Sequence, residues 1–167
     1  MSHEVVSALI IRSQKILLGL RSSTRAFYPD VWDMFGGHVE PGETHEQTLV
    51  QELQEELGIT PTHWTYLETL RLPLPAPTSP PPNPTSAGPV SNQEFNVGFG
   101  GGAPRSGRRG SQLIAHLYLV TAWKGTPFNR QPEEHSVMHW FSLAEAIQLP
   151  LADPSYPALF ARYLASE

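Results

Sequence analysis

The feature that most constrains this chain is the segment Gly37–Ile59, which holds six of its 16 acidic residues. Thr44 and Gln47 form a capping-box pattern that predicts a helix start, and Gly58 stands where a helix would end on a left-handed residue. Leucines recur every fourth position between these ends, at Leu49, Leu53 and Leu57. The spacing predicts an amphipathic helix with its leucine stripe buried on a core.

Three carboxylates share one face of that helix, beside the leucine stripe. At about 100° per residue, Glu52 and Glu56 lie together and Glu55 lies further round. Like charges at this spacing repel, and no Lys or Arg lies within the segment to relieve the repulsion. A solvated acidic face is one interpretation. The other is a site for a hard divalent cation, Mg²⁺ or Mn²⁺, with the flexible Gly36-Gly37 backbone turned toward the same face.

The segment resembles the signature of the Nudix family, Gly-x5-Glu-x7-Arg-Glu-U-x-Glu-Glu-x-Gly-U, in which U is bulky and aliphatic. Eight of its fixed positions match, namely Gly37, Glu43, Glu52, Leu53, Glu55, Glu56, Gly58 and Ile59. The run is particularly similar to the MutT-like branch, although Phe35 stands where proline is usual. The resemblance implies an α/β fold of the Nudix type, an α/β/α sandwich with a mixed sheet.

The resemblance also implies an enzyme that hydrolyses a phosphoanhydride bond of a small-molecule nucleotide. A nucleoside triphosphate cleaved to monophosphate and pyrophosphate is the favoured substrate, and nucleotide sugars and dinucleoside polyphosphates are alternatives. The implied catalytic residues are Glu52, Glu55 and Glu56. These three and the Gly36 carbonyl would hold Mg²⁺ or Mn²⁺, and Glu52 is also the implied water-activating base.

Two neighbouring acidic positions have subsidiary predicted roles. Glu43 is expected to anchor the loop or helix. Glu133 or Glu134, just before a predicted strand, would add a loop carboxylate to the site, with a solvated turn as the alternative.

The chain departs from the signature at Gln51, where the family has arginine. Glutamine can donate a hydrogen bond but brings no charge and no bidentate fork. A catalytically weak domain that binds a nucleotide derivative is therefore the competing hypothesis. Arg21 could compensate for the missing arginine, contact substrate phosphate, or be an ordinary surface residue.

Substrate binding is predicted for Arg21, Trp32 and Phe35, with Phe27 and Tyr28 as further aromatics that could stack on a base. Their alternative interpretation is as core residues. His116 is expected to be a core histidine with a satisfied hydrogen bond.

Composition restricts the class of protein. A length of 167 residues suits one domain, predicted over 1–167, and a net charge of −5 argues against general nucleic-acid binding. The absence of cysteine excludes thiolate metal sites and suits a reducing compartment. No apolar run reaches membrane-spanning length, so a cytoplasmic protein is expected. A homodimer is left open.

A Pro/Gly-rich stretch interrupts the domain. Nine of the 17 prolines lie between Pro73 and Pro104, followed by a basic run at Arg105–Arg109. The lack of periodicity predicts a long disordered insertion over 73–112. A third hypothesis makes this insertion a partner-binding segment carried by the domain.

The remaining periodicities predict strands at Val5–Arg12 and Lys15–Arg21, joined by a turn at Ser13-Gln14, and further strands near Trp32–Phe35 and at Trp64–Leu72, Leu113–Trp123 and Val137–Phe141. A short helix is expected after Ser142 and a terminal one at Tyr156–Leu164. Both faces of Leu113–Trp123 are apolar, which predicts a central strand covered on both sides.

Overall fold

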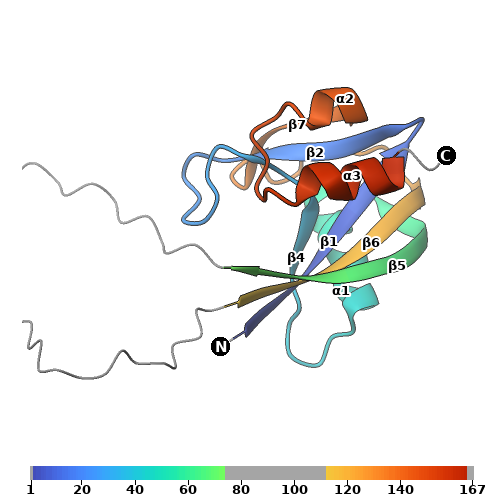
Figure 1. The fold of residues 1–167 in the computed structure, drawn as a ribbon. Helices are drawn as coiled ribbons and strands as arrows, with labels where there is room; N and C mark the ends of the chain where they lie inside the picture. The colour runs from blue at the N-terminus through green and yellow to red at the C-terminus, as the bar shows by residue number, and fades with distance from the viewer. Residues whose placement is uncertain (1, 74–111, 165–167) are drawn as a thin grey trace, which may run out of the picture.

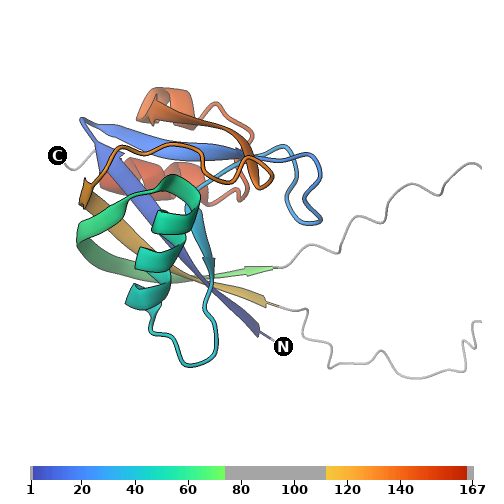
Figure 2. The ribbon, with the colours of Figure 1, turned by 180° about the vertical axis from the view of Figure 1, so that it is seen from behind.

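A mixed sheet is the centre of the computed structural model, which describes residues 2–73 and 112–164. Within these ranges its strands are β1 (Ser2–Arg12), β2 (Lys15–Arg21), β3 (Trp32–Asp33), β4 (Phe35–His38), β5 (Thr60–Pro73), β6 (Gln112–Lys124) and β7 (His135–Ser142). The helices are α1 (His45–Leu57), α2 (Leu143–Ala146) and α3 (Tyr156–Leu164). Helix α1 covers one face and α2 and α3 lie on the other (Figure 1; Figure 2). The predicted α/β/α arrangement is confirmed.

Strand β1 organises the sheet. It pairs in parallel with β6 and antiparallel with β4, and its last residues pair antiparallel with β2. The strand order is β3-β2-β1-β6-β5, with β4 on β1 and β7 on β2. The β1–β2 hairpin turns on Ser13 and Gln14, both with positive φ (51° and 61°), as the two-residue turn predicted.

Two apolar clusters, one on each face, hold the layers together. Side chains of β1 and β6 alternate between them, so that Ala115 and Leu117 face α3 whereas Tyr118 and Val120 face α1. The prediction that β6 is covered on both sides is therefore confirmed. The leucine stripe of α1 is completely buried in the second cluster, at Leu49, Leu53 and Leu57. Each of these side chains contributes about 1.5–3 kcal/mol of burial free energy, which fixes the rotation of α1.

Both ends of α1 form as the sequence predicts. Thr44 accepts a hydrogen bond from the Gln47 N–H and the Gln47 side chain accepts one from the Thr44 N–H. Gly58 ends the helix in the left-handed region, at φ 67°. With both ends and the buried stripe fixed, the acidic face of α1 is held toward β4.

One element differs from its prediction. The single strand expected near Trp32–Phe35 is two short strands separated by Met34, because β3 pairs with β2 whereas β4 pairs with β1. The predicted insertion over 73–112 lies, except at its two ends, outside the described residues. Among residues 2–73 and 112–164, no helix combines the length and apolarity that crossing a membrane requires.

Candidate active site

The acidic face of α1 opens on a cavity of about 430 Å³, a volume typical of small-molecule sites. Glu52, Glu55 and Glu56 line one side of it, together with Gly36 and Gly37 of β4. The capped helix and its buried stripe aim these carboxylates, and β4 brings its backbone against them. The structure therefore unites the glutamates and the glycine that the sequence singled out.

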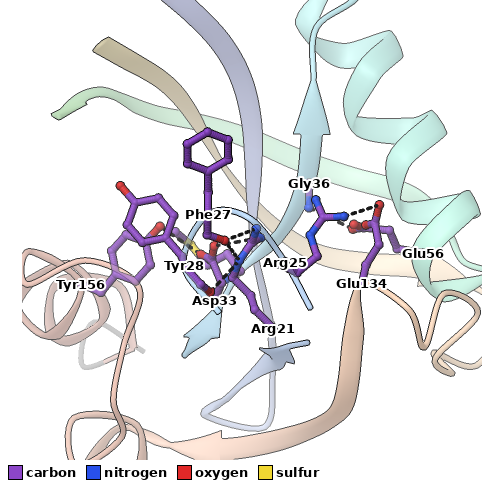
Figure 3. A network of polar contacts seen from close by, with 10 residues as sticks. Arg21, Arg25, Phe27, Tyr28, Asp33, Gly36, Glu56, Glu134 and Tyr156 are labelled. Carbon is purple, nitrogen blue, oxygen red and sulfur yellow. Dashed lines mark hydrogen bonds and ion pairs between the residues drawn. The ribbon is translucent and has the colours of Figure 1, made fainter. Parts of the chain in front are cut away.

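Glu56 is the most buried of the three, with 3% of its surface exposed. Its Oε2 accepts a hydrogen bond from the Gly36 N–H at 3.0 Å, and its carboxyl lies close to that of Glu134 (Figure 3). The ring of His135 also lies within ligand distance of these two carboxyls. Burial, followed by the hydrogen bond to Glu134, raises the pKa of Glu56 well above its ordinary value. Two carboxyls thus share a confined space.

Glu134 is the loop carboxylate that joins the cavity. It comes from the turn before β7 and forms an ion pair with Arg25 at 3.8 Å (Figure 3). Glu133 is exposed and does not line the cavity. The sequence offered both residues, and only the direction of the turn distinguishes them.

Glu52 lies directly over the β4 backbone. A Cβ on Gly37 would overlap the Glu52 carboxyl, so a glycine at that position leaves room for the acid. Burial and then the neighbouring charge of Glu55 raise the pKa of Glu52 to about 7. This carboxyl therefore gains and loses a proton near neutral pH when no cation is present.

Gln51 keeps one contact with the acidic face. Its Nε2 donates a hydrogen bond to Glu55 Oε1 at 3.1 Å. Glu43 accepts hydrogen bonds from the Thr48 hydroxyl at 3.0 Å and from the Glu40 N–H at 3.4 Å. Glu43 therefore anchors the loop to the helix, as predicted.

The donor set fits a hard divalent cation. The carboxylates of the cavity lie close together and repel one another, and a bound cation would neutralise that repulsion. His135 adds a second observation, because its Nε2 is buried with no hydrogen-bond partner among the described residues. Burial and then the charges of Arg21 and Arg25 lower the pKa of His135 to about 4, so its ring is neutral at the edge of the cluster.

The opposite side of the cavity carries aromatic rings and a second pair of acids. Asp33 Oδ1 accepts hydrogen bonds from the Tyr156 hydroxyl at 3.0 Å and from the Met34 N–H at 2.8 Å (Figure 3). Burial raises the pKa of Asp33 despite an ion pair with Arg21 at 3.8 Å. Asp153 lines the same side. The sequence analysis missed Asp33, Asp153 and Tyr156, although Asp33 stands three residues before Gly36.

Arg21 holds the segment that closes this side. Its guanidinium donates to the carbonyls of Phe27 at 2.9 Å and Tyr28 at 3.0 Å (Figure 3). These contacts and the ion pair with Asp33 commit it to the 22–30 loop, away from Gln51. Phe27 and Tyr28 line the cavity, and Phe27 is 40% exposed.

Two predicted substrate-binding residues, Trp32 and Phe35, lie outside the cavity lining. Phe35 is 1% exposed and packs in the α1-side core against the ring of His135, 4.9 Å away. Trp32 packs on Phe141, with ring centroids 4.8 Å apart, against the other core cluster. Neither residue lines the cavity. Their strands turn these rings inward and leave Asp33 and Met34 toward the cavity.

This fold and this site define a protein with a mixed sheet between helices and a cavity whose clustered carboxylates suit a divalent metal ion. A family model described as the NUDIX domain matches residues 1–163, so the chain belongs to the Nudix family. The sequence is 34% identical over 158 residues to a CTP pyrophosphohydrolase of Escherichia coli (strain K12), across 93% of this chain and 87% of that protein.

Solved structures agree with this assignment. The solution structure of the E. coli ORF135 protein superposes with a TM-score of 0.62 at 31% identity, covering 98% of this chain and 89% of the other. A MutT NUDIX hydrolase from Burkholderia pseudomallei shares the fold at 24% identity, with a TM-score of 0.60 over 87% of this chain and 86% of the other. The resemblance predicted from the sequence is confirmed. The chain is a Nudix hydrolase, an enzyme that hydrolyses phosphoanhydride bonds of nucleotides. The family uses divalent metals for this reaction.

Proposed function

We propose that the protein hydrolyses a nucleoside triphosphate to a monophosphate and pyrophosphate, with Mg²⁺ or Mn²⁺. The observation that carries the proposal is the division of one cavity into an acidic side and a side with aromatic rings and paired acids. The first side suits a metal-bound polyphosphate and the second suits a base. The similarity to a CTP pyrophosphohydrolase supports a triphosphate as substrate.

The metal would be held by Glu52, Glu55 and Glu56, with the Gly36 carbonyl completing the set. Glu134 is the fifth candidate ligand, because its carboxyl lies beside that of Glu56. Bound there, the ion would neutralise phosphate charge and lower the pKa of a water molecule.

Glu52 has the properties of a general base. Its pKa is about 7 without a cation, and a bound cation would lower that value and keep the carboxyl ionised, available to accept a proton from water. Transfer of that proton to Glu52 would let the water oxygen bond to phosphorus while the bridging oxygen leaves with its electron pair.

The 22–30 loop would form the base-binding wall. Phe27 and Tyr28 offer ring faces to a nucleobase, and Asp33 and Asp153 offer hydrogen-bond partners to its edge. The predicted contact of Arg21 with substrate becomes an indirect one, in which Arg21 positions the two aromatic residues.

Binding without turnover is the competing function, and Gln51 is the observation that favours it. The single hydrogen bond from Gln51 to Glu55 restrains the acidic face less than a charged, bidentate arginine would.

The test is release of pyrophosphate or phosphate from a panel of nucleoside triphosphates, dinucleoside polyphosphates and nucleotide sugars, each with Mg²⁺ and with Mn²⁺. Glu52→Gln and Glu56→Gln run beside the wild type, and Glu133→Gln is the matched control at an exposed glutamate outside the cavity. Turnover of triphosphates that both pocket variants lose and the control keeps would establish the function. Tight nucleotide binding with turnover no greater than that of Glu52→Gln would replace it with a binding function.

A further inference from the structure

A second group of metal-ligand side chains lies outside the active-site cavity, where α1 begins. Glu4 of β1, His45 of α1 and His116 of β6 each offer one ligand atom, and these atoms lie within 4.8 Å of one another. His116 Nε2 is 3.5 Å from Glu4 Oε1, and His45 Nε2 is 4.0 Å from Glu4 Oε2. None of the three lines the cavity of the acidic cluster. The metal site of the proposed function therefore leaves this group unexplained.

His116 is the buried member, with 9% of its surface exposed. The sequence analysis predicted a core histidine with a satisfied hydrogen bond, and this is correct for one ring nitrogen only. Nδ1 lies 3.0 Å from the Thr69 hydroxyl on the adjacent strand, whereas Nε2 is buried with no hydrogen-bond partner in the described part of the chain. Because Nδ1–H can donate to Thr69, the lone pair of Nε2 is left directed toward Glu4. A hydrogen bond from the second ring nitrogen is the usual orienting contact of a metal-bound histidine.

His45 completes the group from the first position of α1. Its ring stacks on that of His116, with centroids 3.8 Å apart and planes at 23°. Positive charges on two stacked rings would repel each other. Burial and then the neighbouring His45 lower the pKa of His116, and the smaller opposite effect of Glu4 does not offset them. An ion pair between a charged histidine and Glu4 therefore does not explain why these three side chains lie together.

We propose that Glu4, His45 and His116 bind a zinc-class divalent ion, separate from the metal of the acidic cluster. Two imidazole nitrogens and one carboxylate oxygen form a borderline ligand set of the kind zinc takes, with a further position for water. Ligand atoms about 2.0–2.2 Å from a tetrahedral ion lie roughly 3.3–3.6 Å apart. The distances from the two Nε2 atoms to the Glu4 carboxylate oxygens, 3.5 and 4.0 Å, are close to that range. Rotation of the partly exposed His45 ring out of its stack on His116 would direct its Nε2 toward the same ion.

The ion would join three elements distant in the sequence. It would link the start of β1, the first residue of α1 and the middle of β6, across the face that α1 covers. Since the unfolded chain does not bring these residues together, binding would raise the unfolding temperature, by an amount that grows with the logarithm of the free Zn²⁺ concentration once that exceeds the dissociation constant.

The experiment is titration of the untagged, metal-stripped chain with Zn²⁺ by calorimetry, and with Co²⁺ by visible absorption, in millimolar Mg²⁺. Mg²⁺ is present to occupy the hard oxygen site. The test variants are His45→Ala and Glu4→Gln, which alter partly exposed side chains and leave the buried His116 in place. The controls are His63→Ala, an exposed histidine elsewhere on β5, and Glu56→Gln, which removes a ligand from the other histidine-containing cluster.

The proposal expects one equivalent of Zn²⁺ bound by wild type and both controls, with affinity at least tenfold weaker in His45→Ala and Glu4→Gln. Co²⁺ should give the intense d–d absorption of a low-symmetry site, and Zn²⁺ should raise the unfolding temperature of wild type more than that of His45→Ala. Equal Zn²⁺ affinity in wild type and both test variants would overturn the proposal. So would loss of binding in Glu56→Gln alone, or no binding by wild type at millimolar Zn²⁺.

Discussion

Replacing Glu52 by glutamine should stabilise the metal-free protein while abolishing catalysis. Glutamine has nearly the shape of glutamate, so it keeps the contact with Gly37 and removes only the ionisable group. In the native state burial and the charge of Glu55 raise the pKa of Glu52 from 4.5 to about 7. The ionised Glu52 carboxylate therefore destabilises the native state when no cation is bound.

The sign and size follow from that shift. Between pH 4.5 and about 7 the native state binds more protons at Glu52 than the unfolded state does, so its contribution to stability falls as the pH rises through this window. At about 1.36 kcal/mol per pKa unit, a fully buried group would lose about 3 kcal/mol. Because Glu52 is only partly buried, solvent screening reduces the expected loss to about 1–2 kcal/mol. Glu52→Gln should recover that amount at pH 8 and nothing at pH 4.5.

The assay is urea unfolding in a chelating buffer at pH 4.5 and pH 8, with Glu133→Gln as the matched control. A gain of 1–2 kcal/mol moves the urea midpoint by about 0.5–1 M at pH 8. In saturating Mg²⁺ the wild type should become more stable than Glu52→Gln, because the wild type binds the ion more tightly than the variant does. A gain of the same size at both pH values, or no gain at pH 8, would refute the argument.

Three further predictions concern single residues. Gln51→Arg should raise kcat by about tenfold or more in steady-state assays, because a charged fork restrains the acidic face more firmly than one hydrogen bond; an unchanged kcat would show that glutamine suffices. Gly37→Ala should lower kcat/KM at least tenfold with little change in the unfolding temperature, because the added Cβ displaces the flexible Glu52 side chain; normal kinetics would contradict this. Tyr156→Phe should lower the free energy of unfolding in urea by about 1–3 kcal/mol, because it removes the hydroxyl that donates to the partly buried Asp33; a neutral effect would mean that water replaces the hydroxyl.

Local sequence rules predicted the parts of the fold that depend on neighbouring residues. The Thr44 cap, the Gly58 end and the leucine stripe set α1 almost to the residue, since each depends on spacing within one helix. Ser13 and Gln14 predicted their hairpin for the same reason. The carboxylates of α1 followed directly, because a helix of known ends and known buried face has only one acidic face.

Features that depend on contacts between distant segments of the chain could not be predicted from the sequence. Phe35 and Trp32 are aromatic residues beside a binding motif, and only the division into β3 and β4 shows that Phe35 lies in one core and Trp32 packs against the other. Asp33 and Tyr156 are 123 positions apart, and no local sequence pattern predicts their hydrogen bond. The sequence could not distinguish Glu134 from Glu133 as the loop carboxylate of the site, because the direction of each side chain depends on the turn before β7.

The measurement that tests the central claim most directly is pyrophosphate release from the best nucleoside triphosphate, with and without Mg²⁺, by wild type and by Glu56→Gln. Circular dichroism of both proteins would confirm that the variant is folded. The account predicts turnover by wild type that requires Mg²⁺ and falls at least a hundredfold in Glu56→Gln. Equal turnover by the two proteins, or turnover by wild type in a chelating buffer, would contradict the assignment of the α1 carboxylates as the metal site.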